Sequence, residues 1–254
     1  MFMMERFKGE LNWINPDKLI TKNGYDKTEC FFIGLGVVFN DLKGLILFEK
    51  MLIENYEKPQ NGEVTSHVGN YSGTMVQIKK LIASTINEFF IFLKKNSDVF
   101  SESEFKQVFN RLCRSDRQLW EAMVAAAHGK LSTVTDLLNS IVQIRNNITY
   151  HYYQSGKALR NGYISRFFGK VKDDRNKFAY YSIGDTLETT RFYFSDVAVE
   201  ESLYMAAGKK PRESIVGDVS LAKYHEQVKE TIKVMNTTIA SLLKNYIQSR
   251  RNRP

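Results

Sequence analysis

The chain contains 254 residues, enough for one large domain or for one core with appendages. Its hydrophobic fraction of 43% is ordinary for a soluble globular protein. The formal net charge of +8 gives a modest preference for polyanions such as RNA, but a basic surface often serves solubility alone.

Targeting and membrane signals are weak in this sequence. The first ten residues lack a basic start followed by a long apolar run, so we expect no signal peptide. The most apolar run, residues 31–48, contains Asn40, Asp41 and Lys43, which argue for a buried helix and against a membrane span. Cys30 and Cys113 have no zinc-site spacing, so we expect buried free thiols, a reducing compartment and a cytoplasmic protein.

Hydrophobic spacing predicts a mainly helical chain. An irregular arm, residues 1–27, comes first, and Ser101 to Glu104 has the pattern of a capping box at a helix start. Gly156 and Gly162 either bend the fourth helix or end it early. A short extended piece is expected at residues 178–182. The helices are expected at residues 28–56, 72–95, 101–127, 132–168, 186–207 and 220–249.

The sequence lacks the strands that carry most α/β enzyme sites, so the predicted architecture is an all-α bundle with additions. We divide it into an N-terminal arm (1–27), a helical bundle (28–168), and a basic linker with a C-terminal helical extension packed on the same body (169–254). Phosphate-loop, zinc-protease and serine-hydrolase motifs are absent. The acidic residues between 185 and 201 lack the Glu-x-x-His repeats of a di-metal bundle and predict a solvated acidic face, with no metal or other cofactor.

A dense polar cluster follows an apolar approach in residues 141–153. A permanently charged guanidinium and an imidazole that titrates near neutral pH, with five residues between them, suit phosphate chemistry. Amides and phenols surround these two groups. The cluster consists of Arg145, Asn146, Asn147, Tyr150, His151 and Tyr153.

A basic run over residues 157–177 comes directly after this cluster. Tyr163, Phe167 and Phe168 are interleaved with its cations, and only Asp173 and Asp174 oppose them. Cations that track a backbone, with aromatic rings for the bases, are typical of single-strand binding. The alternative is a solvated loop over a small apolar cluster. The cations are Lys157, Arg160, Arg166, Lys170, Lys172, Arg175 and Lys177.

Arg145 followed by Asn146, with His151 closing the motif, resembles the HEPN (higher eukaryotes and prokaryotes nucleotide-binding) superfamily. The resemblance covers about residues 28–168 and implies a helical bundle with the motif on a late helix. Many members are metal-independent endoribonucleases of toxin–antitoxin or anti-phage defence systems. The resemblance thus implies an enzyme that acts on RNA as a homodimer. A neighbour-encoded antitoxin or activator protein is a further expected partner, and we expect no association with a membrane.

The same resemblance implies roles for the motif residues. His151 would act as general base or acid in attack of the RNA 2′-OH on the adjacent phosphate, and Arg145 would hold that phosphate. Asn146 would orient His151 or the phosphate by hydrogen bonding. Tyr150 and Tyr153 would contact the nucleotide; Tyr153 also matches a tyrosine that partner enzymes adenylylate in shorter HEPN toxins. Asn147, Lys157, Arg160 and Arg166 complete the expected substrate-binding set.

Helix geometry constrains this site. At roughly 100° per residue, Arg145 and His151 point about 120° apart on one straight helix, so they do not converge on one atom. Either the helix kinks near His151, or two copies share a composite cleft with two Arg145 and two His151, which we favour. Two other interpretations stay open: an ion-pairing, helix-capping cluster, and a catalytically inactive HEPN-like module for RNA binding, dimerisation or adaptor use.

Overall fold

The computed structural model describes residues 12–21, 24–56, 65–130, 152–169, 178–186, 189–206 and 219–251 of the chain. Within these residues the regular elements are helices, apart from one isolated antiparallel bridge between Ser182 and Arg191. The prediction of an all-α protein is therefore confirmed for the described part of the chain.

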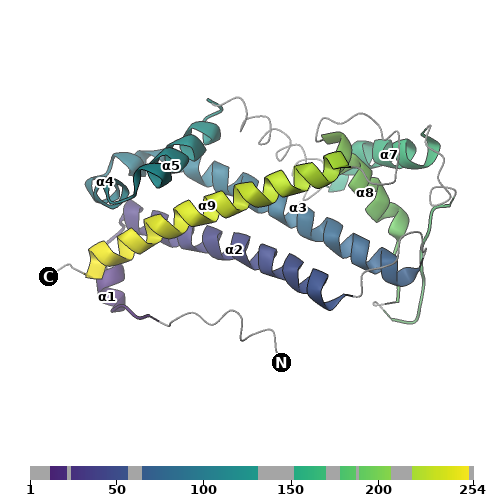
Figure 1. Cartoon of the computed structure of the whole chain (residues 1–254), viewed down its shortest axis with the longest axis horizontal. Helices are drawn as coiled ribbons and strands as arrows, with labels where there is room; N and C mark the ends of the chain where they lie inside the picture. The colour runs from purple at the N-terminus through teal and green to yellow at the C-terminus, as the bar shows by residue number, and fades with distance from the viewer. Residues whose placement is uncertain are drawn as a thin grey trace.

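Three long helices form the body: α2 (Lys27–Asn55), α3 (Ser66–Lys95) and α9 (Val219–Arg251), which run along the long axis of the molecule (Figure 1). α2 and α9 are antiparallel, because Glu29 near the start of α2 meets Arg250, while Glu49 near its end meets Lys229. The predicted helices at 28–56 and 220–249 agree with α2 and α9 to within two residues.

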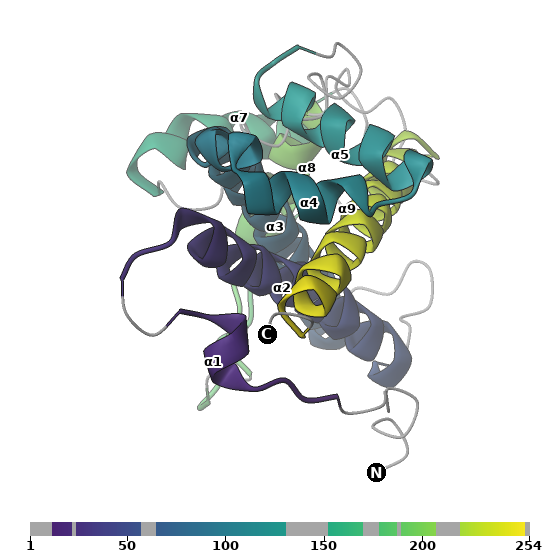
Figure 2. The same cartoon turned by 90° about the vertical axis from the view of Figure 1, so that its left-hand side faces the viewer.

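Shorter helices close the two ends of this body. α4 (Ser103–Asn110) and α5 (Arg114–Ala127) lie across one end, as Figure 2 shows, and α7 (Tyr152–Phe168) with α8 (Tyr193–Ala206) lies at the other. The one-turn helix α1 (Pro16–Leu19) packs against the C-terminal part of α9.

The prediction of one helix over residues 101–127 is wrong. The chain forms a 3₁₀ helix, η2 (Ser97–Ser101), then α4, then a turn at residues 111–113 whose last residue, Cys113, is extended with ψ 163°. α4 packs on η2 and α9, whereas α5 packs on α3 and α9. The turn therefore lets α4 and α5 pack on different neighbours, which one straight helix would not do.

The predicted capping box at Ser101 is also wrong. The N-cap of α4 is Glu102, which makes no side-chain capping bond, and the Ser101 hydroxyl donates instead to the carbonyl of Asp98. The Glu104 carboxylate accepts a hydrogen bond from Arg250 of α9. A tertiary contact with Arg250 thus takes the place of the local capping contact that the sequence predicted for Glu104.

Aromatic rings fill the core where α2, α3 and α5 meet. Phe31 is fully buried and lies 5.1 Å from the ring of Phe92 and 6.2 Å from that of Trp120. Gly34 allows this approach of α3, since a Cβ there would lie 2.8 Å from Phe92. The core continues into α9, which buries Ile232, Met235, Ile239, Leu242 and Tyr246. α9 is thus a core helix that shares one hydrophobic cluster with α2 and α3.

The surface differs from expectation at both cysteines and along α2. Cys30 and Cys113 are exposed, so the prediction of buried thiols is wrong. α2 is also only partly buried: 22% of its most apolar window lies inside the protein. By length and composition α2 could cross a membrane, but core helices and signal sequences meet the same criterion.

Candidate functional site

Most of the predicted catalytic cluster falls outside the described residues. This applies to Arg145, Asn146, Asn147, Tyr150 and His151. Tyr153 belongs to the first turn of α7, the helix that follows the motif directly. The mutual arrangement of the motif side chains therefore stays a prediction, and the described part of the site begins on α7.

α7 is held in place by a close crossing with α8. At Gly162 a Cβ would lie 2.3 Å from the carbonyl oxygen of Ala198, so only glycine permits this separation of the two helices. The Ser202 hydroxyl donates to the carbonyl of Ala158 at 2.9 Å, across the same contact. Gly162 thus neither ends nor interrupts the helix; it lets α8 fix α7 at the end of the bundle.

A buried carboxylate strengthens this crossing. Glu201 is only 2% exposed and accepts a hydrogen bond of 2.9 Å from the Ser165 hydroxyl. Asp196, one turn earlier on α8, pairs with Arg191 at 2.8 Å. The prediction of a solvated acidic face is therefore wrong for these two residues, because each carboxylate has a side-chain partner.

α8 also begins later than the predicted helix at residue 186. Ser182 and Arg191 exchange backbone hydrogen bonds of 2.8 and 2.9 Å, which holds residues around Arg191 in an extended bridge. Helix geometry starts only at Tyr193. The Arg191 side chain then reaches Asp196, so the bridge orients the first turn of α8.

The three predicted substrate-binding cations on α7 do not share one face. Lys157 and Arg160 are exposed and about 60° apart around the helix axis, whereas Arg166 is half-buried and about 180° from Lys157. Lys157 and Arg160 therefore form one cationic edge that a polyanion can reach from solvent. Arg166 belongs to a different side of the helix.

A cavity of about 510 Å³ lies beside Arg160, where α3, α7 and α8 meet. Its walls bring together Arg160 and Tyr163 of α7, Phe194 and Asp196 of α8, and Lys80 of α3. Tyr163 also packs against Phe167 at a ring distance of 4.5 Å. Two cations and two aromatic rings around one opening can hold a phosphate and the face of a base.

Lys80 is a charged residue of this cavity that the sequence analysis did not identify. Burial lowers the pKa of its ammonium, and the charge of Asp196 partly opposes that effect. A lysine in the middle of the long apolar pattern of α3 was the available signal, because such a lysine must either extend to the surface or line a cavity. Lys80 lines the cavity.

Exposed aromatic side chains surround the same end of the molecule. Phe168, at the last residue of α7, is 76% exposed, and Phe178 and Tyr181 are similarly accessible. Rings that project into solvent beside cations offer stacking surfaces for unpaired bases. Among the described residues, no group of three or more His, Cys, Asp or Glu side chains could hold a metal ion.

Comparisons with known proteins give no relative for this chain. No protein-family model matches it, and neither the curated proteins nor the solved structures contain a significant match.

Proposed function

We propose that the protein is a metal-independent endoribonuclease of the HEPN type that acts as a dimer, as a toxin or anti-phage defence effector. The observation that carries the proposal is the Arg145–Asn146 pair followed by His151, directly before α7 in the sequence of a chain whose described part is mainly helical. An always-charged donor and a group that titrates near neutral pH are the two components that metal-free cleavage of RNA needs.

Features of α7 support RNA as the substrate. Lys157 and Arg160 form an exposed cationic edge only a few residues after His151, and Arg160 and Tyr163 line the adjoining cavity. An RNA strand bound at the motif would continue along this edge. Lys157 and Arg160 would contact its phosphates there, and the Tyr163 ring would contact a base.

The proposed reaction is an internal transfer of the phosphate. A His151 imidazole takes the proton of the 2′-OH, the 2′ oxygen bonds to phosphorus, and the bond from phosphorus to the 5′ oxygen breaks. Water gives a proton to that 5′ oxygen, and the His151 imidazolium returns its own proton to water, so one histidine and one arginine complete each reaction. The Arg145 guanidinium stabilises the extra negative charge on the phosphate oxygens in the transition state. The products are a 2′,3′-cyclic phosphate and a 5′-hydroxyl.

Incubation of the purified dimer with single-stranded RNA, with and without EDTA, tests the proposal. We expect cleavage in both conditions, none of a DNA of the same sequence, and loss of cleavage in His151→Ala and Arg145→Ala. Circular dichroism should show that both variants keep the wild-type helix content. If the wild-type protein is dimeric and the RNA stays intact in both conditions, the proposed endoribonuclease activity is refuted.

Mixing two inactive variants tests the composite cleft. A heterodimer of Arg145→Ala and His151→Ala subunits keeps one intact arginine and one intact histidine on opposite chains. If the residues act across the interface, mixing restores part of the activity; if they act within one chain, it restores none. RNA that is bound by the wild-type protein but never cut would favour the inactive RNA-binding module instead.

A further inference from the structure

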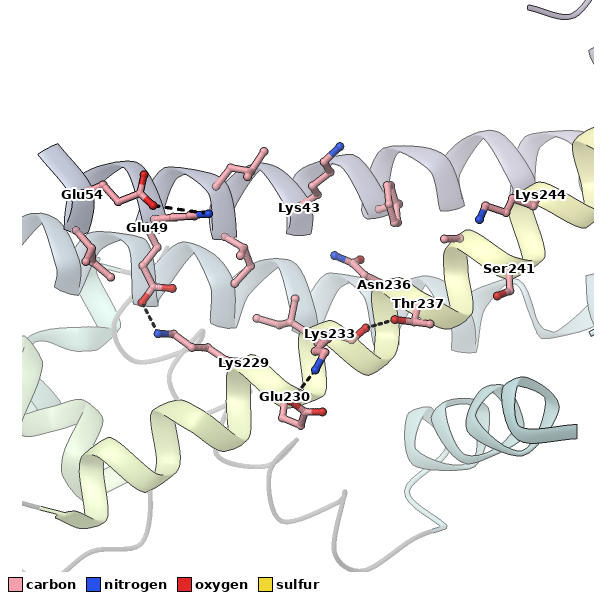
Figure 3. A pocket seen from close by; sticks show the side chains of 17 residues that line it. Lys43, Glu49, Glu54, Lys229, Glu230, Lys233, Asn236, Thr237, Ser241 and Lys244 are labelled. Carbon is pink, nitrogen blue, oxygen red and sulfur yellow. Dashed lines mark hydrogen bonds and ion pairs between the residues drawn. The ribbon is translucent and has the colours of Figure 1, made fainter. Parts of the chain in front are cut away.

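A long groove separates α2 from α9 on the side of the molecule shown in Figure 3. Its volume is about 820 Å³, and it is lined from Phe39 to Glu54 on α2 and from Lys229 to Lys244 on α9. At 1.5 Å per residue each wall is about 22 Å long, which is about four turns of a helix. The groove is therefore an elongated channel between two antiparallel walls.

The floor of the groove is apolar and its edges are cationic. Ile232 is almost fully buried, whereas Ile53 leaves 48% of its surface exposed at one end. The apolar lining consists of Phe39, Ile46, Leu47, Ile53, Ile232 and Ala240. Five lysines and three glutamates are the charged side chains among the described lining residues, so positive charge is in excess there.

The lysines are spread along the whole groove. Lys229 is 3.3 Å from the buried Glu49 near one end, and Lys50 is 3.6 Å from Glu54. Lys43 near the middle and Lys244 at the other end are exposed, and within the described residues neither lies within 4.0 Å of a carboxylate. Two positive charges on opposite walls thus remain available to a ligand.

An unsatisfied polar atom also faces this space. Asn236 reaches between the two helices in Figure 3, and its Oδ1 atom is buried with no hydrogen-bond partner among the described residues. A buried carbonyl oxygen without a donor is unfavourable by about 1–3 kcal/mol in general. Because this atom is buried, a ligand in the groove pairs with it only after the Asn236 side chain turns outward.

The distribution of these groups distinguishes between ligands. Among the described residues that line the groove, Phe39 is the one aromatic, so a nucleic acid would find little to stack on. A fatty-acid anion carries one charge at one end, whereas Lys43 and Lys244 lie on different walls of the groove, about two helical turns apart along it. An apolar floor with lysines on both walls is complementary to an apolar stripe with carboxylates on both flanks. An amphipathic helix with acidic flanks has this arrangement.

We propose that the α2–α9 groove binds an acidic amphipathic helix of a partner protein. The apolar face of that helix packs on Ile46 and Ile53, which both leave surface exposed, and its flanking carboxylates pair with Lys43 and Lys244. The inference does not depend on RNA cleavage, since the described residues that line the groove come from α2 and α9 and include none of the cations on α7.

Fluorescence anisotropy with a panel of labelled model helices, each of about 16 residues, tests the proposal on the full chain. The helices carry Leu, Ile or Phe on one face and Glu on both flanks; a matched panel carries Lys in place of Glu. We expect at least one acidic helix to bind and the basic panel to bind at least about tenfold more weakly, because charge complementarity decides between them.

The double variant Lys43→Glu/Lys244→Glu should weaken binding of the acidic helix about tenfold or more, because both flanking pairs become repulsive. The control Lys106→Glu/Arg114→Glu makes the same charge change on α4 and α5 and should leave binding within about twofold. Ala240→Trp, which fills the groove without a charge change, should also block binding.

Three results would overturn the proposal. In the first, no acidic helix binds. In the second, the acidic helix binds the double variant as tightly as it binds the control. In the third, the double variant loses binding of a labelled RNA or a labelled fatty acid but keeps binding of the acidic helix.

Discussion

Arg250 and Glu29 are 221 residues apart in sequence, yet Arg250 Nη1 donates to Glu29 Oε1 at 2.7 Å inside the protein. Both residues are almost fully buried. Arg250 Nη2 donates to Glu104 Oε2 at 3.0 Å, and Glu29 accepts a further bond of 3.0 Å from the backbone of Thr21. One guanidinium therefore joins the last turn of α9 to the start of α2 and to α4.

Replacing Arg250 by Met should destabilise the protein by about 3 kcal/mol or more, because two carboxylates would lose their cation in a site with little water. Urea unfolding followed by circular dichroism measures this loss. Arg251→Met is the matched control, since the neighbouring arginine is exposed and, within the part of the chain that the structure describes, donates to the Trp13 carbonyl alone. Equal stability of the two variants would contradict the structural role of Arg250.

Stability should also depend on pH through Glu29. Burial alone would raise its pKa, but hydrogen bonds from Thr21 and Arg250 outweigh burial and lower the pKa below the ordinary value of 4.5. A lowered folded-state pKa means that the stabilisation is present above the unfolded pKa and is lost as pH falls through the folded pKa.

The difference in unfolding free energy between wild type and Glu29→Gln should therefore shrink as pH falls below about 4.5. Urea titrations at several pH values between neutral and acid give this difference. Glu121→Gln, which removes an exposed carboxylate of α5, should show a smaller dependence. A constant difference across the range would mean that Glu29 titrates normally.

Two glycine substitutions should act in opposite directions. Gly162→Ala places a Cβ 2.3 Å from the Ala198 carbonyl, so α7 and α8 must separate, with a loss of about 1–3 kcal/mol. Gly36→Ala in α2 meets no heavy atom within 4 Å and should be neutral or stabilising by up to about 1 kcal/mol. Thermal unfolding of both variants compares them directly; similar losses in both would argue against the close crossing.

RNA affinity should depend on the cationic edge of α7. Lys157→Gln/Arg160→Gln removes two phosphate contacts, which should reduce the slope of log affinity against log salt by about 1.4 for a single strand. Filter binding of a labelled RNA over a salt series, with an inactive His151→Ala background, measures the slope. Lys106→Gln/Arg114→Gln has the same net charge and should keep the wild-type slope. An unchanged slope in the first variant would place the RNA elsewhere.

Sequence patterns predicted the helices well where the pattern was local. The bounds of α2 and α9 follow from a long apolar repeat and from its ends, and these signals act within a few residues. The break between α4 and α5 escaped prediction because its helical periodicity continues through the turn, and only packing on α9 and α3 separates the two helices. The capping box failed for a similar reason, since Arg250 competes for Glu104 from the far end of the chain.

The candidate site divides in the same way. The sequence by itself determined the all-helical class, the Arg145 to His151 motif and the cations that follow it, because these depend on residue type and spacing alone. Tertiary structure alone decided that Lys157 and Arg160 share an exposed edge without Arg166, that Lys80 joins Arg160 and Tyr163 around one cavity, and that lysines of α2 and α9 line one groove. Such groups come from distant parts of the chain, and their proximity follows from how the helices pack, which no local pattern encodes.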